Sequence, residues 1–382
     1  MSGTARSLVA SSAIVFALLL GACSATYQKF DSPKHLRELY VDRLGPVGET
    51  LEVPYDLDLE LKTQVLERLN PARSERQRTN DIIDFVFGWL DLEYALTPTR
   101  NANETFYARE GNCLSFVNLF VGIAREQRLN PVYVEVNDLQ KWNYRDGVVV
   151  SQGHIVAGIY LDGQLTTYDF LPYRSKSYRN LNPIDDLAAS AHFYNNLAAE
   201  ALLEDDVSRA LDLVAVAVAL APDFTKALNN KGVALMRVGR VGEALELYQR
   251  ALARDPMDVA LLSNTVRAYQ LQGNEDKARE YLALLEQTNH TSPYFFVYRG
   301  DRALARGDTD EALNYLRRAL KRDSEIPEVH LGLARVYIAT GEVDKARHHV
   351  QRALRLDATH TGARRLARML STDFQVQEAS QP

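Results

Sequence analysis

The chain has 382 residues, of which 46% are hydrophobic and 25% are charged, and its formal net charge is −6. These proportions are typical of folded domains and the length suggests two or three of them, so the composition excludes a largely disordered protein. A net negative charge also gives no general reason to bind nucleic acid or anionic lipid, and we expect no nucleic-acid partner.

The N-terminus has the three-part order of a secretory signal. A single cationic residue is followed by an uncharged apolar run over residues 8–20, which is too short to span a membrane comfortably, and then by small residues. The four residues that end at Cys23 (LGAC) resemble the lipobox of bacterial lipoproteins, in which cleavage leaves a lipid-modified cysteine at the new N-terminus. We therefore expect residues 1–22 to be a lipoprotein signal peptide and Cys23 to be lipidated, with an ordinary secretory signal as the alternative.

Ser24 follows the expected lipidation site, and this position resembles the outer-membrane sorting pattern of such lipoproteins. The resemblance implies a lipid anchor in the outer membrane and a protein that faces the periplasm. The chain contains two cysteines, so if Cys23 is lipidated, Cys113 has no disulfide partner within the chain. An unpaired thiol in an oxidising compartment calls for deep burial or for a chemical role.

A first domain is expected over residues 51–172. Residues 23–50, which precede it, are polar and contain several chain-breaking residues, so they are predicted to form a tether. Apolar residues at helical spacing predict helices at 58–69 and 76–92 and a third helix that starts at or near Cys113.

Three β-rich segments complete this domain. They lie at residues 132–136, 153–160 and 164–170, and Asp162-Gly163 is a strong hairpin signal between the last two. Helices followed by strands imply an α+β domain with an antiparallel sheet. Residues 173–190 are predicted to be an irregular linker.

Beyond the linker, alanine recurs every 34 residues, at Ala210, Ala244, Ala278, Ala312 and Ala346. Small or apolar residues also recur seven residues after and twelve residues before these alanines. This period resembles the tetratricopeptide family, whose paired antiparallel helices need small side chains where they approach closely. The resemblance implies an all-α solenoid of five repeats over residues 191–360, a capping helix at 361–372 and a disordered tail at 373–382.

Cys113, His154 and Asp169 are the strongest candidates for chemistry, because the cysteine stands at a predicted helix start and the other two stand on successive predicted strands. A helix N-terminus favours a thiolate and offers N–H groups to an oxyanion. An imidazole on an adjacent strand can take the thiol proton, and a carboxylate opposite it can orient the ring and stabilise the imidazolium.

Three short segments around these residues carry a family resemblance: REGNCLSF at 109–116, GHIV at 153–156 and YDF at 168–170. They resemble the transglutaminase-like superfamily, which includes bacterial transglutaminase-like cysteine proteinases, over about residues 75–172. The resemblance implies a papain-like α+β domain that needs no cofactor.

The same resemblance implies that Cys113 is the nucleophile, His154 the general base and Asp169 the residue that orients the base. No clear counterpart exists for a side-chain oxyanion donor upstream of the cysteine. Tyr107 and Asn103 are the candidates, and each can equally be an ordinary loop residue.

The concave face of the repeats is the predicted partner surface, because the first helix of each repeat lines that side and residues three and four apart on it share a face. The amide and cationic residues of this predicted groove are Lys226, Asn229, Arg237, Asn264 and Arg267. Such groups could grip a peptide carboxylate or backbone, or could line an ordinary solvated groove. The histidines at 348, 349 and 360 have a spacing that fits solvent exposure, so we expect no metal site.

Two functions of different classes remain open. The first is a membrane-anchored periplasmic thiol enzyme that cleaves or transfers a peptide or isopeptide bond, with the repeats binding the protein or peptide substrate or a protein partner. The second is a catalytically inactive lipoprotein scaffold for envelope assembly. Hydrolysis and acyl transfer share one acyl-enzyme, so the sequence does not separate them.

Overall fold

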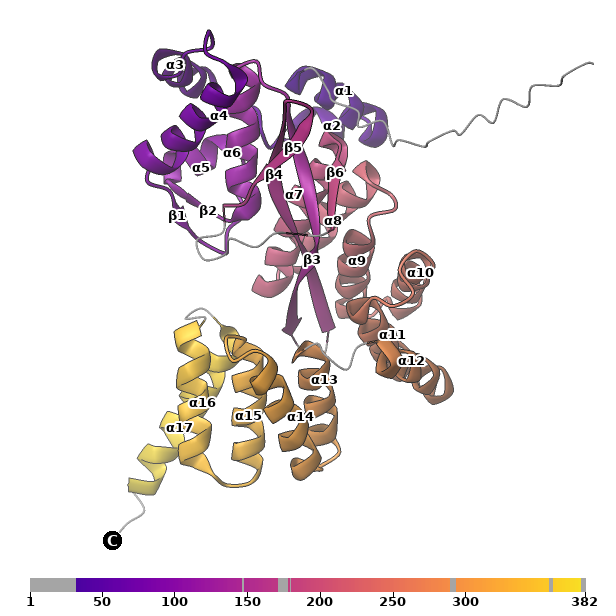
Figure 1. The fold of residues 1–382 in the computed structure, drawn as a ribbon. Coiled ribbons are helices and arrows are strands. Elements are labelled where there is room, and N and C mark those ends of the chain that lie inside the picture. Colours follow the sequence, from indigo (N-terminus) through magenta and orange to yellow (C-terminus); the bar gives the residue numbers. More distant parts are fainter. Residues whose placement is uncertain are drawn as a thin grey trace, which may run out of the picture.

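The computed structural model describes residues 32–145, 148–170, 178, 180–288, 293–356 and 360–378. Figure 1 shows helices and strands in the N-terminal part and an array of paired helices in the C-terminal part. No helix within these ranges is both long enough and apolar enough to cross a membrane.

The N-terminal part consists of helices α1 to α6, the π-helix η1 and strands β1 to β6. Their bounds are α1 (Pro33–Leu44), α2 (Val47–Thr50), α3 (Leu59–Arg68), α4 (Glu75–Ile83), η1 (Asp84–Trp89), β1 (Glu93–Tyr94), α5 (Ala102–Ala108), β2 (Glu110–Gly111), α6 (Cys113–Glu126), β3 (Pro131–Arg145), β4 (Val148–Leu161), β5 (Gln164–Tyr168) and β6 (Leu181–Ile184).

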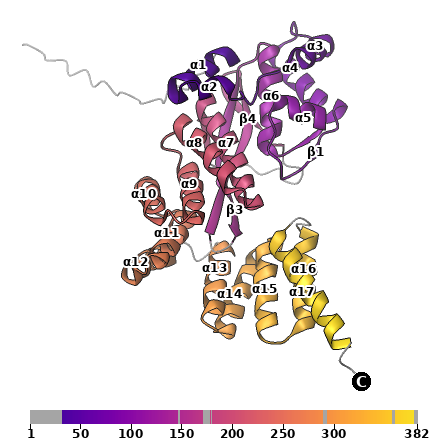
Figure 2. The ribbon, with the colours of Figure 1, turned by 180° about the vertical axis from the view of Figure 1, so that it is seen from behind.

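The main sheet has the strand order β5-β4-β3-β6, and every neighbouring pair is antiparallel. β3 and β4 pair along almost their whole length, whereas β5 pairs only with residues 157–161 of β4 and β6 only with residues 133–136 of β3. The hairpin of β3 and β4 therefore extends beyond the four-stranded part, and its far end points toward α13 in both views (Figures 1 and 2).

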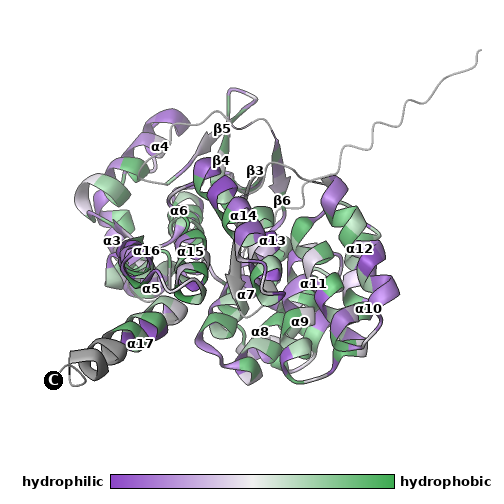
Figure 3. Cartoon of the chain, turned by 90° about the horizontal axis from the view of Figure 1, so that it is seen from below, coloured by the Kyte–Doolittle hydropathy of each residue, from purple (hydrophilic) through white to green (hydrophobic). Residues whose placement is uncertain are grey.

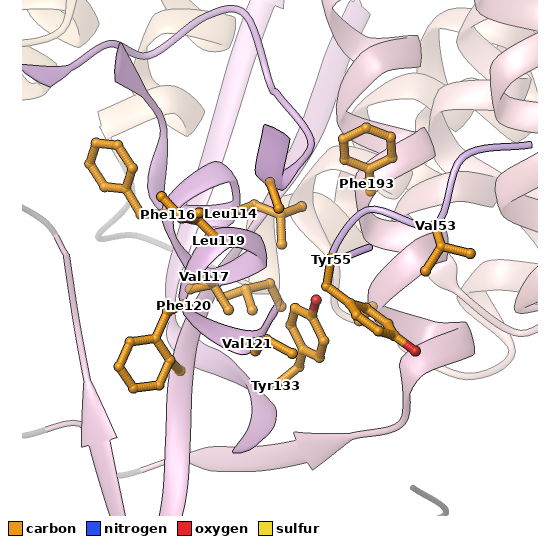
Figure 4. Close-up of a cluster of buried hydrophobic side chains, with 14 of the residues drawn as sticks. Val53, Tyr55, Leu114, Phe116, Val117, Leu119, Phe120, Val121, Tyr133 and Phe193 are labelled. Carbon is orange, nitrogen blue, oxygen red and sulfur yellow. The ribbon is translucent and has the colours of Figure 1, made fainter. Parts of the chain in front are cut away.

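Helix α6 is the centre of the N-terminal core. It packs against α3, α4 and α5 and against β3 and β4, and all of its residues from Cys113 to Ala124 are buried. Figure 4 shows Phe116 and Phe120 on one side of the helix and Val121 on the side that faces Tyr133. A Cβ at Gly122 would lie 2.5 Å from the Tyr55 carbonyl oxygen, so only glycine lets the chain pass so close to α6.

Residues 33–50 were expected to belong to the tether, but they form α1 and α2. Leu36 and Tyr40, four residues apart on one face of α1, are completely buried, and the Tyr40 hydroxyl donates a hydrogen bond to the Ser190 hydroxyl of the following part of the chain. Leu39 and Leu44 of the same helix also pack against the core, partly buried, so apolar contacts hold α1 in place between its charged residues.

The expected linker is also partly ordered. Residues 181–184 form β6, which pairs with β3, and Asp186 begins the helix that follows. A four-residue strand that contains Pro183 has no local strand signal and forms because β3 offers it an edge.

The C-terminal part consists of helices α7 to α17. Their bounds are α7 (Asp186–Glu204), α8 (Val207–Leu220), α9 (Thr225–Arg237), α10 (Val241–Leu252), α11 (Val259–Leu271), α12 (Glu275–Thr288), α13 (Pro293–Ala305), α14 (Thr309–Arg322), α15 (Pro327–Ala339), α16 (Val343–Leu356) and α17 (Thr361–Glu378). Residues 373–378, expected in the disordered tail, continue α17.

The 34-residue period has a packing cause in this array. A Cβ at Gly232 would lie 2.3 Å from the Tyr248 ring, so a small residue is required where α9 meets α10. The turns inside the later pairs use glycines with positive φ at the same period: Gly239, Gly273, Gly307 and Gly341. Seen from below, hydrophilic residues gather on the outer helices α10 and α12 (Figure 3).

Candidate functional site

The first turn of α6 places Cys113 at a helix N-terminus. Asn112 has an extended backbone and its side-chain oxygen accepts a hydrogen bond from the Ser115 N–H at 3.0 Å, which makes it the N-cap. A Cβ at Gly111 would lie 2.6 Å from the Ser115 Cβ, so the chain can enter the helix this tightly only through glycine. Cys113 is 6% exposed, and the positive end of a helix favours the charged form of such a thiol.

His154 on β4 and Asp169 just after β5 form a direct pair. The Nε2 atom of His154 lies 3.2 Å from each oxygen of the Asp169 carboxylate, and the histidine side chain is completely buried. The other ring nitrogen, Nδ1, is also buried and has no hydrogen-bond partner of regular geometry among the described residues. The Cys113 thiol is the second group that interacts with this ring.

Burial alone would lower the pKa of His154, but hydrogen bonding to Asp169 and Cys113 raises it to about 9. The imidazolium is therefore the favoured form at neutral pH. Its positive charge beside Cys113 favours a thiolate, which is the nucleophilic form of cysteine. The structure thus brings together the three residues that the sequence singled out.

Two tyrosines that the sequence did not single out also belong to this cluster. Tyr178 donates a hydrogen bond to Asp169 Oδ2, and its oxygen lies 3.5 Å from His154 Nε2. Tyr94 on β1 pairs in parallel register with Gly111, and its pKa is raised by burial and then by the negative charges of Cys113 and Asp169. Neither position carries a local signal, because β1 has two residues and Tyr178 lies in the expected linker.

Tyr107 and Asn103 lie elsewhere. The Tyr107 hydroxyl donates to the Asp58 carboxylate at 3.0 Å, and Asn103 donates to the Asp56 carbonyl and accepts from the Asp58 N–H, each at 2.9 Å. Both residues therefore hold the loop before α3. The structure gives them no contact with Cys113 and does not support either as an oxyanion donor.

The predicted groove residues on α9 and α11 mostly make contacts within the chain. Lys226 forms an ion pair with Glu135 of β3, and each side chain is 16% exposed. Asn264 donates to Asn229 at 2.7 Å, and both side chains are buried. Arg237 binds Asp205 at 3.1 Å, whereas Arg267 is exposed. These amides therefore do not face an open groove.

Comparison with known families decides the nature of the helical array. A family model of the tetratricopeptide repeat matches residues 235–296 and 303–370. The C-terminal part of the chain carries tetratricopeptide repeats. The matched residues lie after Asp169, so the transglutaminase-like resemblance of the N-terminal part stays a prediction.

Several solved structures are similar to this chain in part. A thermophilic tetratricopeptide-repeat protein of Thermus thermophilus has 22% sequence identity and a TM-score of 0.42, with 48% of this chain and 99% of that chain covered. YrrB, titled as a tetratricopeptide-repeat protein with an unusual peptide-binding site, has 18% identity and a TM-score of 0.29, with 47% and 92% covered. PilF of Pseudomonas aeruginosa has 19% identity and a TM-score of 0.36, with 50% and 87% covered. The search of curated proteins found no match.

Strand β4 explains why the tetratricopeptide groove residues are covered. It contacts α7, α9 and α11, which are the first helices of the first three repeats. The same strand carries His154, so the hairpin that holds the general-base candidate lies on the concave side of these repeats (Figure 1).

The remaining predicted sites are placed as follows. Cys23 lies outside the described residues. Within the part of the chain that the structure describes, no group of three histidine, cysteine, aspartate or glutamate side chains is arranged to hold a metal ion. A cavity of about 880 Å³ lies between α5 and the first tetratricopeptide repeat, and Cys113 is not among its lining residues.

Proposed function

We propose that this chain is a membrane-anchored thiol enzyme that acts on a peptide or isopeptide bond, and that its tetratricopeptide repeats bind a protein substrate or partner. The observation that supports the enzyme best is the environment of His154. Its Nε2 atom lies 3.2 Å from Asp169, its ring interacts with Cys113, and its pKa is raised to about 9. Tetratricopeptide repeats support a role in protein–protein interaction.

In the proposed reaction the Cys113 proton moves to His154 and the thiolate attacks the carbonyl carbon of the substrate. N–H groups in the first turn of α6 stabilise the oxyanion that forms. The carbon–nitrogen bond then breaks as the imidazolium gives its proton to the leaving amine, which leaves a thioester on Cys113. Attack by water completes hydrolysis, and attack by a second amine completes transfer.

Two further side chains have roles in this proposal. Asp169 keeps the His154 ring oriented and stabilises its charged form. Tyr94, whose raised pKa keeps its hydroxyl protonated, interacts electrostatically with Cys113 and pairs with Gly111 two residues before it, so it is the side-chain candidate for the oxyanion donor. Tyr94 thus replaces Tyr107 and Asn103 as the candidate side-chain donor to the oxyanion.

We also propose that the protein is anchored through a lipid on Cys23 to the outer membrane and faces the periplasm. This rests on the order of charge, apolar run and lipobox-like residues at the N-terminus. Mass spectrometry of the purified N-terminal peptide tests it. A diacylated Cys23 supports the anchor, and a chain that retains residues 1–22 or lacks lipid contradicts it.

A reactive ester, whose acetyl group would form a thioester with Cys113 as p-nitrophenolate leaves, tests the enzyme without knowledge of the substrate. The full chain is mixed with p-nitrophenyl acetate, and acetylated Cys113 is measured by mass spectrometry. We expect acetyl-Cys113 to accumulate in the wild type and not in His154→Gln. Equal acetylation in the two proteins would remove the proposed general base.

The second candidate is a protein-interaction scaffold without turnover. Two observations favour it: the matched family model covers only the repeats, and Cys113 is 6% exposed. In a strain that lacks the gene, a scaffold predicts full complementation by Cys113→Ala. An enzyme predicts that Cys113→Ala fails although the protein is present in normal amount.

A further inference from the structure

Helix α7 of the first tetratricopeptide repeat is attached to both ends of α6. At the C-terminal end of α6, the Arg125 guanidinium forms a two-pronged ion pair with Asp186, with distances of 2.7 and 3.0 Å. At the N-terminal end, the connection starts from Glu200, which is 6% exposed. Its Oε1 accepts hydrogen bonds from the Thr99 N–H at 2.8 Å and from the Thr99 hydroxyl at 2.7 Å.

The path continues from Thr99 to the N-cap of α6. Asn112 Nδ2 donates to the Thr99 hydroxyl oxygen at 2.7 Å, and Asn112 Oδ1 accepts from the Ser115 N–H and from the Ser115 hydroxyl, each at 3.0 Å. Glu200, Thr99 and Asn112 thus form an unbroken line of hydrogen bonds that ends beside Cys113.

The direction of each bond in this line is fixed by chemistry. A carboxylate only accepts, so the Thr99 hydroxyl must donate to Glu200 and present its lone pairs to Asn112. The Asn112 NH₂ group then points to Thr99, which turns its oxygen toward the Ser115 N–H. The Ser115 N–H and a longer bond from Asn112 Nδ2 to the Leu96 carbonyl at 3.4 Å favour the same orientation of the amide. The acceptor on Glu200 reinforces it through the shorter Thr99 bond, and a flipped amide could not cap α6.

The carboxylate of Glu200 is an unusual choice for a purely structural acceptor. Burial raises the pKa of Glu200, and its hydrogen bonds with Thr99 offset only part of that effect. A neutral acceptor would hold Thr99 without this cost. Glu200 also lines the cavity of about 880 Å³ together with Glu204 and Arg209 of the same repeat.

We propose that Glu200 is a positioning residue for Cys113: through Thr99 and Asn112, the first tetratricopeptide repeat holds the first turn of α6 in the geometry that activates the thiol. This inference rests on the proposed function, because it assumes that Cys113 is an activated nucleophile. It makes the repeat array part of the active-site framework and not only an appended binding module.

The test is the pH dependence of Cys113 alkylation by iodoacetamide in the full chain. Glu200→Ala and Thr99→Val are expected to raise the pKa of the thiol and to slow alkylation at about pH 6 by about tenfold, which corresponds to one pH unit. Thr99→Ser keeps the hydroxyl and should behave like the wild type. Glu204→Gln, in the same helix and the same cavity, is the matched control and should also be unchanged.

Hydrogen exchange at the Ser115 amide gives a readout that does not depend on the thiol. Glu200→Ala should increase exchange at Ser115, and the double variant with Thr99→Val should add little, because both changes break one path. A wild-type pH profile and wild-type exchange in Glu200→Ala would overturn the inference. If the wild-type thiol itself titrates as an ordinary cysteine, the proposed function and this inference both fail.

Discussion

Replacing Asp169 by asparagine is expected to lower the pKa of His154, because the hydrogen bond to Asp169 contributes most to raising it. The ordinary pKa of a histidine is 6.5, and in this chain the pKa of His154 is raised to about 9. The difference corresponds to ~3.4 kcal/mol of preference for the imidazolium. Burial, which acts in the opposite direction, remains in Asp169→Asn, and so does the contribution of Cys113, so the pKa of His154 should fall from about 9 toward its ordinary value.

This substitution also changes how stability depends on pH. The pKa of His154 is higher in the folded chain than in the unfolded chain, so binding of its proton stabilises the fold. This contribution is fully present below about pH 6.5 and is lost as the pH rises through about 9. The wild type should therefore lose up to ~3 kcal/mol from this group across that window, and Asp169→Asn should lose much less.

The assay is an NMR titration of the His154 ring in protein labelled at histidine. Asp162→Asn is the matched control, because Asp162 lies in the turn between β4 and β5 and pairs with the exposed Arg76. It should leave the His154 titration unchanged. An unchanged His154 titration in Asp169→Asn would refute the account of this pair.

Two other predictions concern the repeats. A double-mutant cycle of Lys226→Met and Glu135→Gln should give a coupling of ~1–3 kcal/mol in the free energy of unfolding, because both partners are largely buried. The control Arg267→Ala, at an exposed residue, should leave stability unchanged. A cycle without coupling would mean that the pair does not hold β3 to α9. Gly232→Ala should lower stability by ~1–3 kcal/mol, because it forces a methyl group against Tyr248. The control Gly242→Ala, in open space on α10, should be neutral or slightly stabilising in thermal denaturation. Equal effects of the two substitutions would remove the packing explanation of the small residues.

The features that the sequence predicted are those with local signals. The helix at Cys113 follows from its N-cap Asn112 and from an apolar stripe. The repeat array follows from the 34-residue period, for which close contacts such as Gly232 on Tyr248 and Gly300 on Leu316 give a packing cause. The sequence also allowed three site residues to be proposed together, because each belongs to a recognisable element. Cys113 begins a helix, His154 lies within a strand and Asp169 directly follows one.

The features that the sequence missed depend on distant partners. Glu200 and Thr99 are 101 residues apart, and nothing near either residue indicates the contact. Asn229 and Asn264 have the spacing of an open groove, but β4 covers them. The apolar residues of α1 are interspersed with charged ones, and the four residues of β6 are too few to give a strand signal. Both elements form on surfaces that the rest of the chain provides.

The most direct test of the account is the rate at which iodoacetamide alkylates Cys113 at about pH 6. The account predicts that folded wild-type protein reacts much faster than the same thiol in denaturant, and that His154→Gln loses this advantage. His192→Gln removes another buried histidine, whose pKa is lowered to about 4, and should keep it. A wild-type thiol that reacts no faster than the denatured one, or that is unaffected by His154→Gln, would contradict the account.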